Sequence, residues 1–488
     1  MRASPFERSI MQVDPSPPPA ELRQVMFGLG LAMLLSALDQ TIVVTAMPTI
    51  GAELGDPQNL PLIVTAYLVA STSVTPLYGK FADVYGRRIV LAIGLMTFII
   101  GSVACAVSPT MGLLATARFI QGLGGGGLIS LAQTVIADLV SPRERGRYQT
   151  YFAAVFATSS IGGPVLGGFF AQYLHWSLIF WINVPLGLAA LITTNAQLKR
   201  LPERRHPHHI DYTGAFALMM ASGSLVLALG RIGGRYPWLS PQILWLFSFS
   251  VGLWLFFIHR TRVFDEPLIP TRILGLAIVR NAIISSSFGL GAFVGLSVVM
   301  PIYYETAIGL NARDSGLALI PFMIATVVGA TCSGRIMASF SHYKIFPTST
   351  LLIASLAAFA TAWRLETLSL FELNILLVFC TFGVGAMLPV ATVSVQNAVD
   401  TRDLGTATAA MQFFRQLATA ALVALLGVFA LGGGRAAMLA SPDLASTMLV
   451  AMIAAYRQVF IFVAVSLGLS CLFLARMEAR PLRSARRS

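Results

Sequence analysis

Two oppositely charged residues stand in strongly apolar surroundings in the first quarter of the sequence. Asp39 lies in the segment LLSALDQTIVV, and Arg118 lies in the segment TARFIQGLG. If both segments cross a membrane, each charge costs about 2.5–3.5 kcal/mol to insert, so it should face other helices and find a partner. At the rise of an α-helix, both residues lie roughly 12–13 Å below the same membrane boundary. We therefore expect Asp39 and Arg118 to form an ion pair.

Such a pair could carry a proton. Burial away from water favours the protonated form of a carboxyl group, whereas a neighbouring arginine favours the ionised form. If a conformational change alters both influences, Asp39 can take up and release a proton with Arg118 as its partner. Ser36, Gln40 and Val43 are assigned to the same helix face, which could also line a cavity. The alternative is a structural ion pair that only orients two helices.

The elements that must hold this pair are membrane-spanning helices. Hydrophobic residues make up 56% of the chain and charged residues only 11%, whereas soluble proteins carry about 25% charged residues. The mean hydropathy is +0.76, and apolar runs of about 18 residues or more recur along the chain. We predict an all-α integral membrane protein with fourteen spans, near 24–47, 60–78, 88–107, 110–139, 149–172, 176–197, 212–231, 239–259, 281–305, 314–337, 346–363, 370–398, 404–430 and 450–474.

The net charge of +12 sets orientation rather than nucleic-acid binding. On the predicted topology most of the 33 lysines and arginines lie on the side that holds both termini. The positive-inside rule places that side in the cytoplasm, whereas a nucleic-acid footprint would cluster on one folded domain. We expect a multi-pass protein of the bacterial inner (plasma) membrane. Residues 1–22 would form a disordered cytoplasmic tail and residues 476–488 a basic one, and no removable signal peptide is expected.

Several other chemistries are excluded or weakly indicated. Gly122, Gly124 and Gly127 have the spacing of a dinucleotide-binding turn, but such a turn follows a strand in a soluble βαβ unit. Inside a span, small residues instead let neighbouring helices approach closely. No phosphate-binding G-x-x-x-x-G-K-[ST] sequence occurs, so an ATP-driven pump is not supported. We expect no cofactor, no nucleic-acid partner and no enzymatic activity.

We also expect no metal site. His206, His208 and His209 cluster in RRHPHHID, which we interpret as a solvated linker. The four cysteines lie far apart and without metal-like or disulfide-like spacing, so we interpret them as packing residues: Cys105, Cys332, Cys380 and Cys471.

Four stretches resemble the major facilitator superfamily, specifically its fourteen-span drug:proton antiporters. They follow one another on the first five spans: LDQTIVVTAMP (38–48), GKFADVYGRR (79–88), RFIQGLGGGG (118–127) and GGPVLGG (162–168). Weaker resemblances follow at DEPLIP (265–270), LIPF (319–322), VQNAV (395–399) and FFRQLATA (413–420). The resemblance implies two six-helix bundles at 23–197 and 281–475, with the linkers and two inserted spans at 198–280.

The resemblance also implies roles for two groups of residues. A cytoplasmic latch would hold one conformation and break in the other, with Asp138 as the partner of Arg87 and with glycines for tight turns; it comprises Gly79, Asp83, Gly86, Arg87, Arg88 and Asp138. Val84 departs from the family pattern, in which a basic residue is usual there. A span-five sequence associated with export rather than import comprises Gly163, Pro164, Gly167 and Gly168.

Two further polar residues within spans need an explanation. Arg415 lies about 16 Å into span thirteen by helical rise and has no evident acidic partner in the sequence. Gating and packing are both open for it. Asn183 in span six could donate or accept a hydrogen bond in a cavity.

Together these features predict a proton-coupled secondary antiporter that exports amphipathic or lipophilic small molecules by alternating access, of the multidrug efflux type. One alternative is a proton-coupled symporter that imports a polar solute. Another is a non-transporting membrane receptor or scaffold. The sequence leaves open whether a periplasmic adaptor and an outer-membrane channel extend the export path.

Overall fold

The computed structural model describes residues 19–56, 59–199, 211–231, 239–264, 266–340, 342–438 and 444–482. All regular secondary structure in these ranges is helical, and fourteen of the helices are long and apolar enough to cross a membrane. The predicted fold class and number of spans are therefore confirmed. Most of the predicted N-terminal tail and the histidine cluster at 206–209 lie outside the described residues.

The first seven spans are α2 (Pro19–Glu53), α3 (Leu60–Tyr85), α4 (Arg87–Ala106), α5 (Met111–Gly125) with α6 (Leu128–Leu139), α7 (Pro142–Tyr173), α8 (Leu178–Trp181) with α9 (Asn183–Leu198), and α10 (Tyr212–Arg231). The second seven are α11 (Pro241–Val263), α13 (Ala277–Tyr303) with η2 (Tyr304–Ile308), α14 (Ala312–Ala318) with α15 (Ile320–Ser339), α16 (Ile345–Arg364), α17 (Leu370–Ala398), η3 (Thr401–Asp403) with α18 (Leu404–Met438), and α19 (Leu444–Arg476). A short helix, α12 (Thr271–Gly275), precedes α13.

The fourth span differs from the single helix predicted at 110–139, because it is interrupted between α5 and α6. A Cβ atom at Gly122 would lie 2.6 Å from the carbonyl oxygen of Tyr67, and one at Gly126 would meet the backbone of Ser71. A Cβ atom at Gly127 would meet the ring of Tyr78. The glycines therefore let α3 press directly against the fourth span, as close packing requires.

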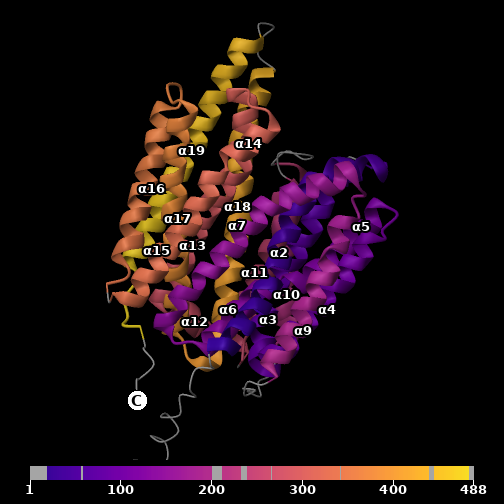
Figure 1. Ribbon diagram of the computed structural model, residues 1–488, viewed down its shortest axis with the longest axis vertical. Helices are drawn as coiled ribbons and strands as arrows, with labels where there is room; N and C mark the ends of the chain where they lie inside the picture. Colours follow the sequence, from indigo (N-terminus) through magenta and orange to yellow (C-terminus); the bar gives the residue numbers. More distant parts are fainter. Residues whose placement is uncertain are drawn as a thin grey trace, which may run out of the picture.

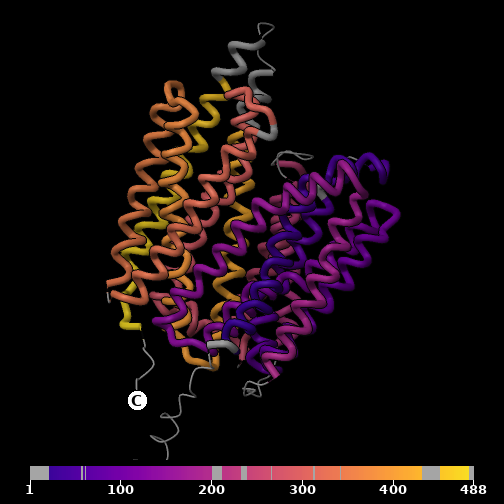
Figure 2. Tube along the Cα trace, in the orientation of Figure 1, coloured from indigo at the N-terminus to yellow at the C-terminus, as the bar shows by residue number. Residues whose placement is uncertain are grey.

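The helices form two halves that meet at one end of the molecule. Figure 1 shows α2 to α5 and α9 on one side and α13 to α17 with α19 on the other, while α7 and α18 run between them. The two groups converge at the end where the chain leaves α19 toward the C-terminus. We call this the inner end. Toward the opposite end the two groups of helices separate, as the trace in Figure 2 also shows.

The inserted helices α10 and α11 pack at the junction of the two halves. Both α3 and α18 contact α10, and the ring of Trp254 on α11 lies 6.2 Å from the ring of Phe413 on α18. Leu218 and Phe257 share a buried cluster with Phe413. The division into bundles at 23–197 and 281–475 stays a prediction.

Candidate proton-coupling site and inner latch

Asp39 and Arg118 meet inside the first half. Asp39 is on α2 and Arg118 is on α5, and their side chains are 0% and 1% exposed. Arg118 Nη1 lies 2.5 Å from Asp39 Oδ2. The two charges, 79 residues apart in the chain, therefore compensate each other away from solvent, as the cost of burying either one alone demands.

Two amides complete the coordination of the carboxylate. Gln121 Nε2 donates to Asp39 Oδ1 over 2.8 Å, and Asn183 Nδ2 on α9 donates to the same oxygen over 3.1 Å. Gln121 also donates to Ser102 Oγ on α4 over 2.8 Å, and its Oε1 accepts from Arg118 Nη1 over 2.6 Å. The carboxylate thus has three donors from two further helices, and four helices are tied together through it.

Aromatic rings surround the guanidinium of Arg118. Its Cζ lies 4.4 Å from the centroid of the Tyr67 ring and 5.7 Å from that of Phe180, distances at which a cation is attracted by a ring face. Its Nε donates to the carbonyl oxygen of Ile63 over 3.3 Å. The arginine is therefore held by α3 and α8 as well as by the carboxylate of Asp39.

Among the cavity residues named from the sequence, Asn183 donates to the carboxylate of Asp39, whereas Gln40 reaches the site only through the side chain of Tyr67. Gln40 is exposed, and its Nε2 donates to the carbonyl oxygen of Ser36 over 3.0 Å. The sequence reasoning missed Gln121, although it lies one helical turn after Arg118 and therefore on the same face. It also missed Tyr67, because one aromatic residue in a span carries no distinguishing pattern.

The inner latch is the second group of residues, and it joins the two halves at the inner end. Asp83 on α3 is buried, and its Oδ2 accepts from the backbone N–H of Thr406 over 2.8 Å and from Thr406 Oγ1 over 2.7 Å. Its Oδ1 accepts from the N–H of Gly405 over 3.2 Å. These groups form the first turn of α18, so a carboxylate of the first half caps a helix of the second.

The remaining latch residues have different partners. Arg87 contacts Asp83 Oδ1 at 2.5 Å and Asp138 Oδ2 at 3.1 Å, which brings three charged groups together as the resemblance implied. Arg88 instead donates to Asn195 Oδ1 over 2.7 Å, within the first half. The structure therefore does not bring Arg88 to the latch.

The two glycines of the latch, Gly79 and Gly86, have different structural roles. Gly86 has φ of +90° between α3 and α4, a conformation that favours glycine and makes the expected turn. The expected turn at Gly79 is wrong, because this residue lies inside α3. A Cβ atom there would lie 2.6 Å from the carbonyl oxygen of Gly405, so Gly79 permits contact between α3 and α18.

A second close contact between the halves joins α7 and α15, in addition to the contact of α3 with α18. A Cβ atom at Gly146 would lie 3.0 Å from the carbonyl oxygen of Gly334, so the backbones are nearly in contact. Arg143 Nε donates to the carbonyl oxygen of Ala338 over 2.8 Å, at the C-terminal turn of α15. The sequence reasoning assigned no role to this arginine.

The span-five glycines are divided between two environments. Cβ atoms at Gly163 and Gly167 would meet Thr41 and Thr45 on α2, so these positions bring α7 against the helix that carries Asp39. A Cβ atom at Gly168 would have no neighbour within 4 Å, so this position is not a packing contact. Pro164 is exposed within α7, which continues on both sides of it.

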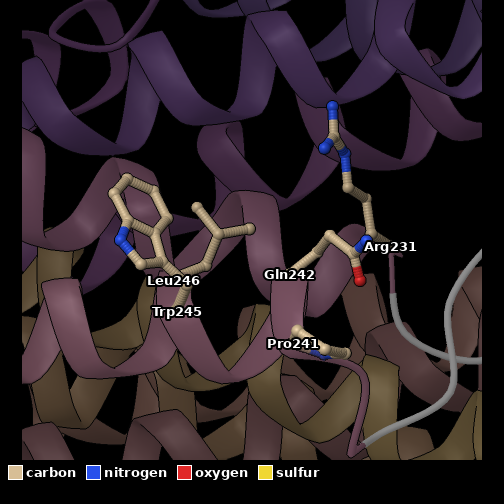
Figure 3. A pocket seen from close by; sticks show the side chains of 5 residues that line it. All are labelled: Arg231, Pro241, Gln242, Trp245 and Leu246. Carbon is tan, nitrogen blue, oxygen red and sulfur yellow. The ribbon is translucent and has the colours of Figure 1, made fainter.

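The pocket shown in Figure 3 is separate from both groups. Its volume is about 430 Å³, and the residues that line it come from the end of α10 and the start of α11: Arg231, Pro241, Gln242, Trp245 and Leu246. None of the residues singled out from the sequence lines it. Trp245 is 62% exposed, so the pocket lies at the periphery of the molecule.

Comparison with known families agrees with the helix arrangement. The sequence model of the Major Facilitator Superfamily matches residues 29–423. The chain belongs to this superfamily. It is therefore a membrane transporter rather than an enzyme, as predicted.

Among its relatives, Multidrug resistance protein 3 of Bacillus subtilis is 34% identical over 416 residues, which are 84% of this chain and 79% of that protein. The multidrug transporter protein MdtP of the same organism is 32% identical over 402 residues, 82% and 74% of the two chains. An uncharacterized MFS-type transporter of Mycobacterium tuberculosis is 34% identical over 394 residues. These cover 80% of this chain, and the chain spans only 57% of the length of that relative.

Solved structures agree on the fold of the superfamily. The human organic anion transporter MFSD10 has a TM-score of 0.64 at 18% identity, with 94% of this chain and 100% of that chain covered. The proton:xylose symporter XylE has a TM-score of 0.63 at 15% identity, with 95% and 98% covered. At these identities the likeness concerns the fold alone.

Proposed function

We propose that the protein is a proton-coupled antiporter that exports amphipathic or lipophilic compounds by alternating access. The observation that carries the proposal is the buried pair of Asp39 and Arg118. A carboxylate that one arginine and two amides hold out of water can bind a proton only when this network opens. Proton exchange at Asp39 would then require the same rearrangement of helices that transport requires.

The inner latch supplies the other half of the proposed cycle. Asp83 and Arg143 each bridge the two halves at the inner end, so the structure corresponds to a state closed at that end. Opening the inner end would break both contacts. Protonation of Asp39 would weaken its attraction to Arg118 and, through α2 and α5, would change the relative stability of the two states.

The export direction is supported by relatives and by the span-five glycines. The two Bacillus subtilis relatives carry multidrug names, and Gly163 and Gly167 bring α7 against α2 beside Asp39. We place the protein in a bacterial inner membrane with the inner end in the cytoplasm, which fits the distribution of basic residues. A periplasmic adaptor and an outer-membrane channel would be partners of such a pump in a two-membrane cell.

The test begins with a susceptibility panel in a pump-deficient host to find an exported compound. Inside-out vesicles are then acidified, and release of protons on addition of that compound is followed with a pH-sensitive dye. Asp39→Asn keeps the shape of the side chain but cannot carry the proton, so substrate-driven proton release should be lost. The matched control is Asp211→Asn, because Asp211 is also buried and pairs with an arginine, Arg260, at 3.2 Å.

Each alternative predicts a different result. Unchanged proton release in Asp39→Asn would leave the pair with a structural role only. If the compound crosses the membrane in the same direction as the protons, the protein is a symporter. A receptor or scaffold would show no substrate-dependent proton movement and would tolerate loss of Asp39 and Arg118 together.

A further inference from the structure

Helix α18 has two faces of opposite character at the junction of the halves. At 3.6 residues per turn, residues spaced three and four apart share a face. The apolar face packs in the buried cluster shared with α3 and the inserted helices: Ala410, Phe413, Phe414 and Leu417. The opposite face is polar over three turns: Thr408, Gln412, Arg415, Gln416 and Thr419.

Arg415 is the charge on this polar face, and its compensation is incomplete. Its side chain is 6% exposed. It donates to Gln412 Oε1, a neutral acceptor on its own helix, while its Nε has no hydrogen-bond partner. Across the described parts of the chain, no carboxylate lies within ion-pair distance of it. A buried guanidinium without a counter-charge contrasts with Arg118, whose carboxylate partner lies at 2.5 Å.

Two neighbours on the same face are also unsatisfied. The Oε1 atom of Gln416 and the Oγ1 atom of Thr419 are buried and have no hydrogen-bond partner. Groups that lie one turn apart on one helix face, with unused donors and acceptors, form a surface that a polar ligand could pair with. Each such atom costs about 1–3 kcal/mol when it is buried without a partner, so a ligand that pairs with these groups would gain that energy on binding.

This face looks into the protein rather than toward lipid. Farther along α18, Leu422 and Leu426 pack against Gly291 and Gly295 of α13. Toward the inner end, Thr408 Oγ1 accepts from Gln396 Nε2 over 3.4 Å. Gln396 also reaches the first half, where it donates to the carbonyl oxygen of Gln133 over 3.5 Å. The polar face is therefore bordered by α13 and by the junction between the halves.

We propose that Arg415 binds the acidic group of an amphipathic organic anion, and that this class of compound is the exported substrate. The guanidinium offers a planar fork of N–H donors that matches a carboxylate, and a bound carboxylate would supply the missing counter-charge. The hydroxyl of Thr419 would donate to the same carboxylate, and Gln416 Oε1 would accept from an N–H or O–H group elsewhere on the molecule. The transport step of this inference rests on the proposed function, whereas binding does not.

The test uses binding to purified protein at one pH without a proton gradient. A set of aryl carboxylates is compared with the matching primary amides, beginning with 1-naphthylacetate and 1-naphthylacetamide, and dissociation constants are taken from thermal stabilisation. Wild-type protein should bind the carboxylates at least about tenfold more tightly than the amides. Arg415→Gln should abolish this preference. Arg364→Gln is the matched control, since Arg364 is a surface arginine with a 57% exposed side chain, and it should retain the preference.

A second variant guards against misfolding of Arg415→Gln. Arg415→Lys keeps the charge and loses the planar fork, so it should retain part of the preference. The inference is overturned if no carboxylate is preferred over its amide, or if Arg415→Gln keeps the preference. It is also overturned if chloride or acetate stabilises the protein as strongly as the naphthyl compounds, because the site would then hold a free ion. Lost proton coupling in Asp39→Asn does not bear on this binding, so the two proposals fail separately.

Discussion

Asp83 on α3 and Thr406 on α18 are joined by two hydrogen bonds although 323 residues separate them in the chain. One carboxylate oxygen accepts from both the backbone N–H and the hydroxyl of Thr406, and the other accepts from the N–H of Gly405. Orphan N–H groups at a helix N-terminus carry partial positive charge. The contact therefore ties the halves by electrostatics as well as by hydrogen bonding.

Asp83→Asn should loosen the inner end. The substitution keeps an acceptor for Thr406 and removes the negative charge from the helix terminus and from Arg87. We expect the closed state to lose about 1.4 kcal/mol of stability relative to the open state, which lowers the ratio of closed to open protein about tenfold. The readout is alkylation, by a membrane-impermeant maleimide in inside-out vesicles, of a cysteine placed at buried Thr408 in a background without the native cysteines. Asp400→Asn is the control because Asp400 is exposed nearby; equal rates in the two variants would contradict the capping role.

Arg143→Ala should also loosen the inner end, but less than Asp83→Asn does. The arginine caps the C-terminal turn of α15 from the start of α7, and an exposed cation at a helix C-terminus contributes about 0.3–1 kcal/mol. We expect alkylation at position 408 to become about two- to fivefold faster. Arg147→Ala, one turn farther along α7 and also exposed, should leave the rate unchanged. An effect that disappears when salt is raised would agree with a charge–dipole contact.

Gly163→Ala should disturb the contact between α7 and α2. The added Cβ would lie 2.7 Å from the Cβ of Thr41, and overpacking of this kind costs about 1–3 kcal/mol. We expect a lower unfolding midpoint and slower export. Gly162→Ala is the matched control, because a Cβ there has no neighbour within 4 Å and alanine favours a helix by about 1 kcal/mol. A destabilised Gly162→Ala and an unaffected Gly163→Ala would reverse the assignment.

The sequence was sufficient to predict the number of spans and the buried ion pair, because the cost of placing polar groups in lipid requires both. Fourteen apolar runs demand fourteen spans, because backbone groups in lipid must be satisfied within each helix. Asp39 and Arg118 lie at equal predicted depths with opposite charges, and neither can be buried without the other. Their pairing in the structure follows from that constraint.

Contacts between distant backbones could not be predicted in this way. Gly79 looked like a turn residue in the same segment as Gly86. Its role instead depends on Gly405, which is far away in the chain and is identified only by the packing of α3 on α18. Arg143 bonds to the carbonyl oxygen of Ala338, and a carbonyl oxygen is present at every residue. Such a partner leaves no signal in the sequence.

The last prediction concerns Gln121, which holds the carboxylate and the guanidinium of the buried pair in place. Gln121→Leu would remove a donor to Asp39 and to Ser102 and an acceptor for Arg118. Because these groups are fully buried, each one left without a partner costs about 1–3 kcal/mol. We expect a clearly lower unfolding midpoint and a changed pH profile of export, since the carboxylate would lose part of its fixed environment.

Gln40→Leu provides the comparison for this variant on the helix that carries Asp39. Gln40 is exposed and makes no contact with the carboxylate of Asp39; its amide donates to the carbonyl oxygen of Ser36, and its side chain also reaches Tyr67. Its replacement should therefore lower the unfolding midpoint less than Gln121→Leu does. If Gln121→Leu lowers stability but leaves the pH profile unchanged, Gln121 supports the bundle without acting on the proton site. A shift of the pH profile in Gln121→Leu alone would support a role for Gln121 in coupling, because its side chain donates to Asp39 and accepts from Arg118.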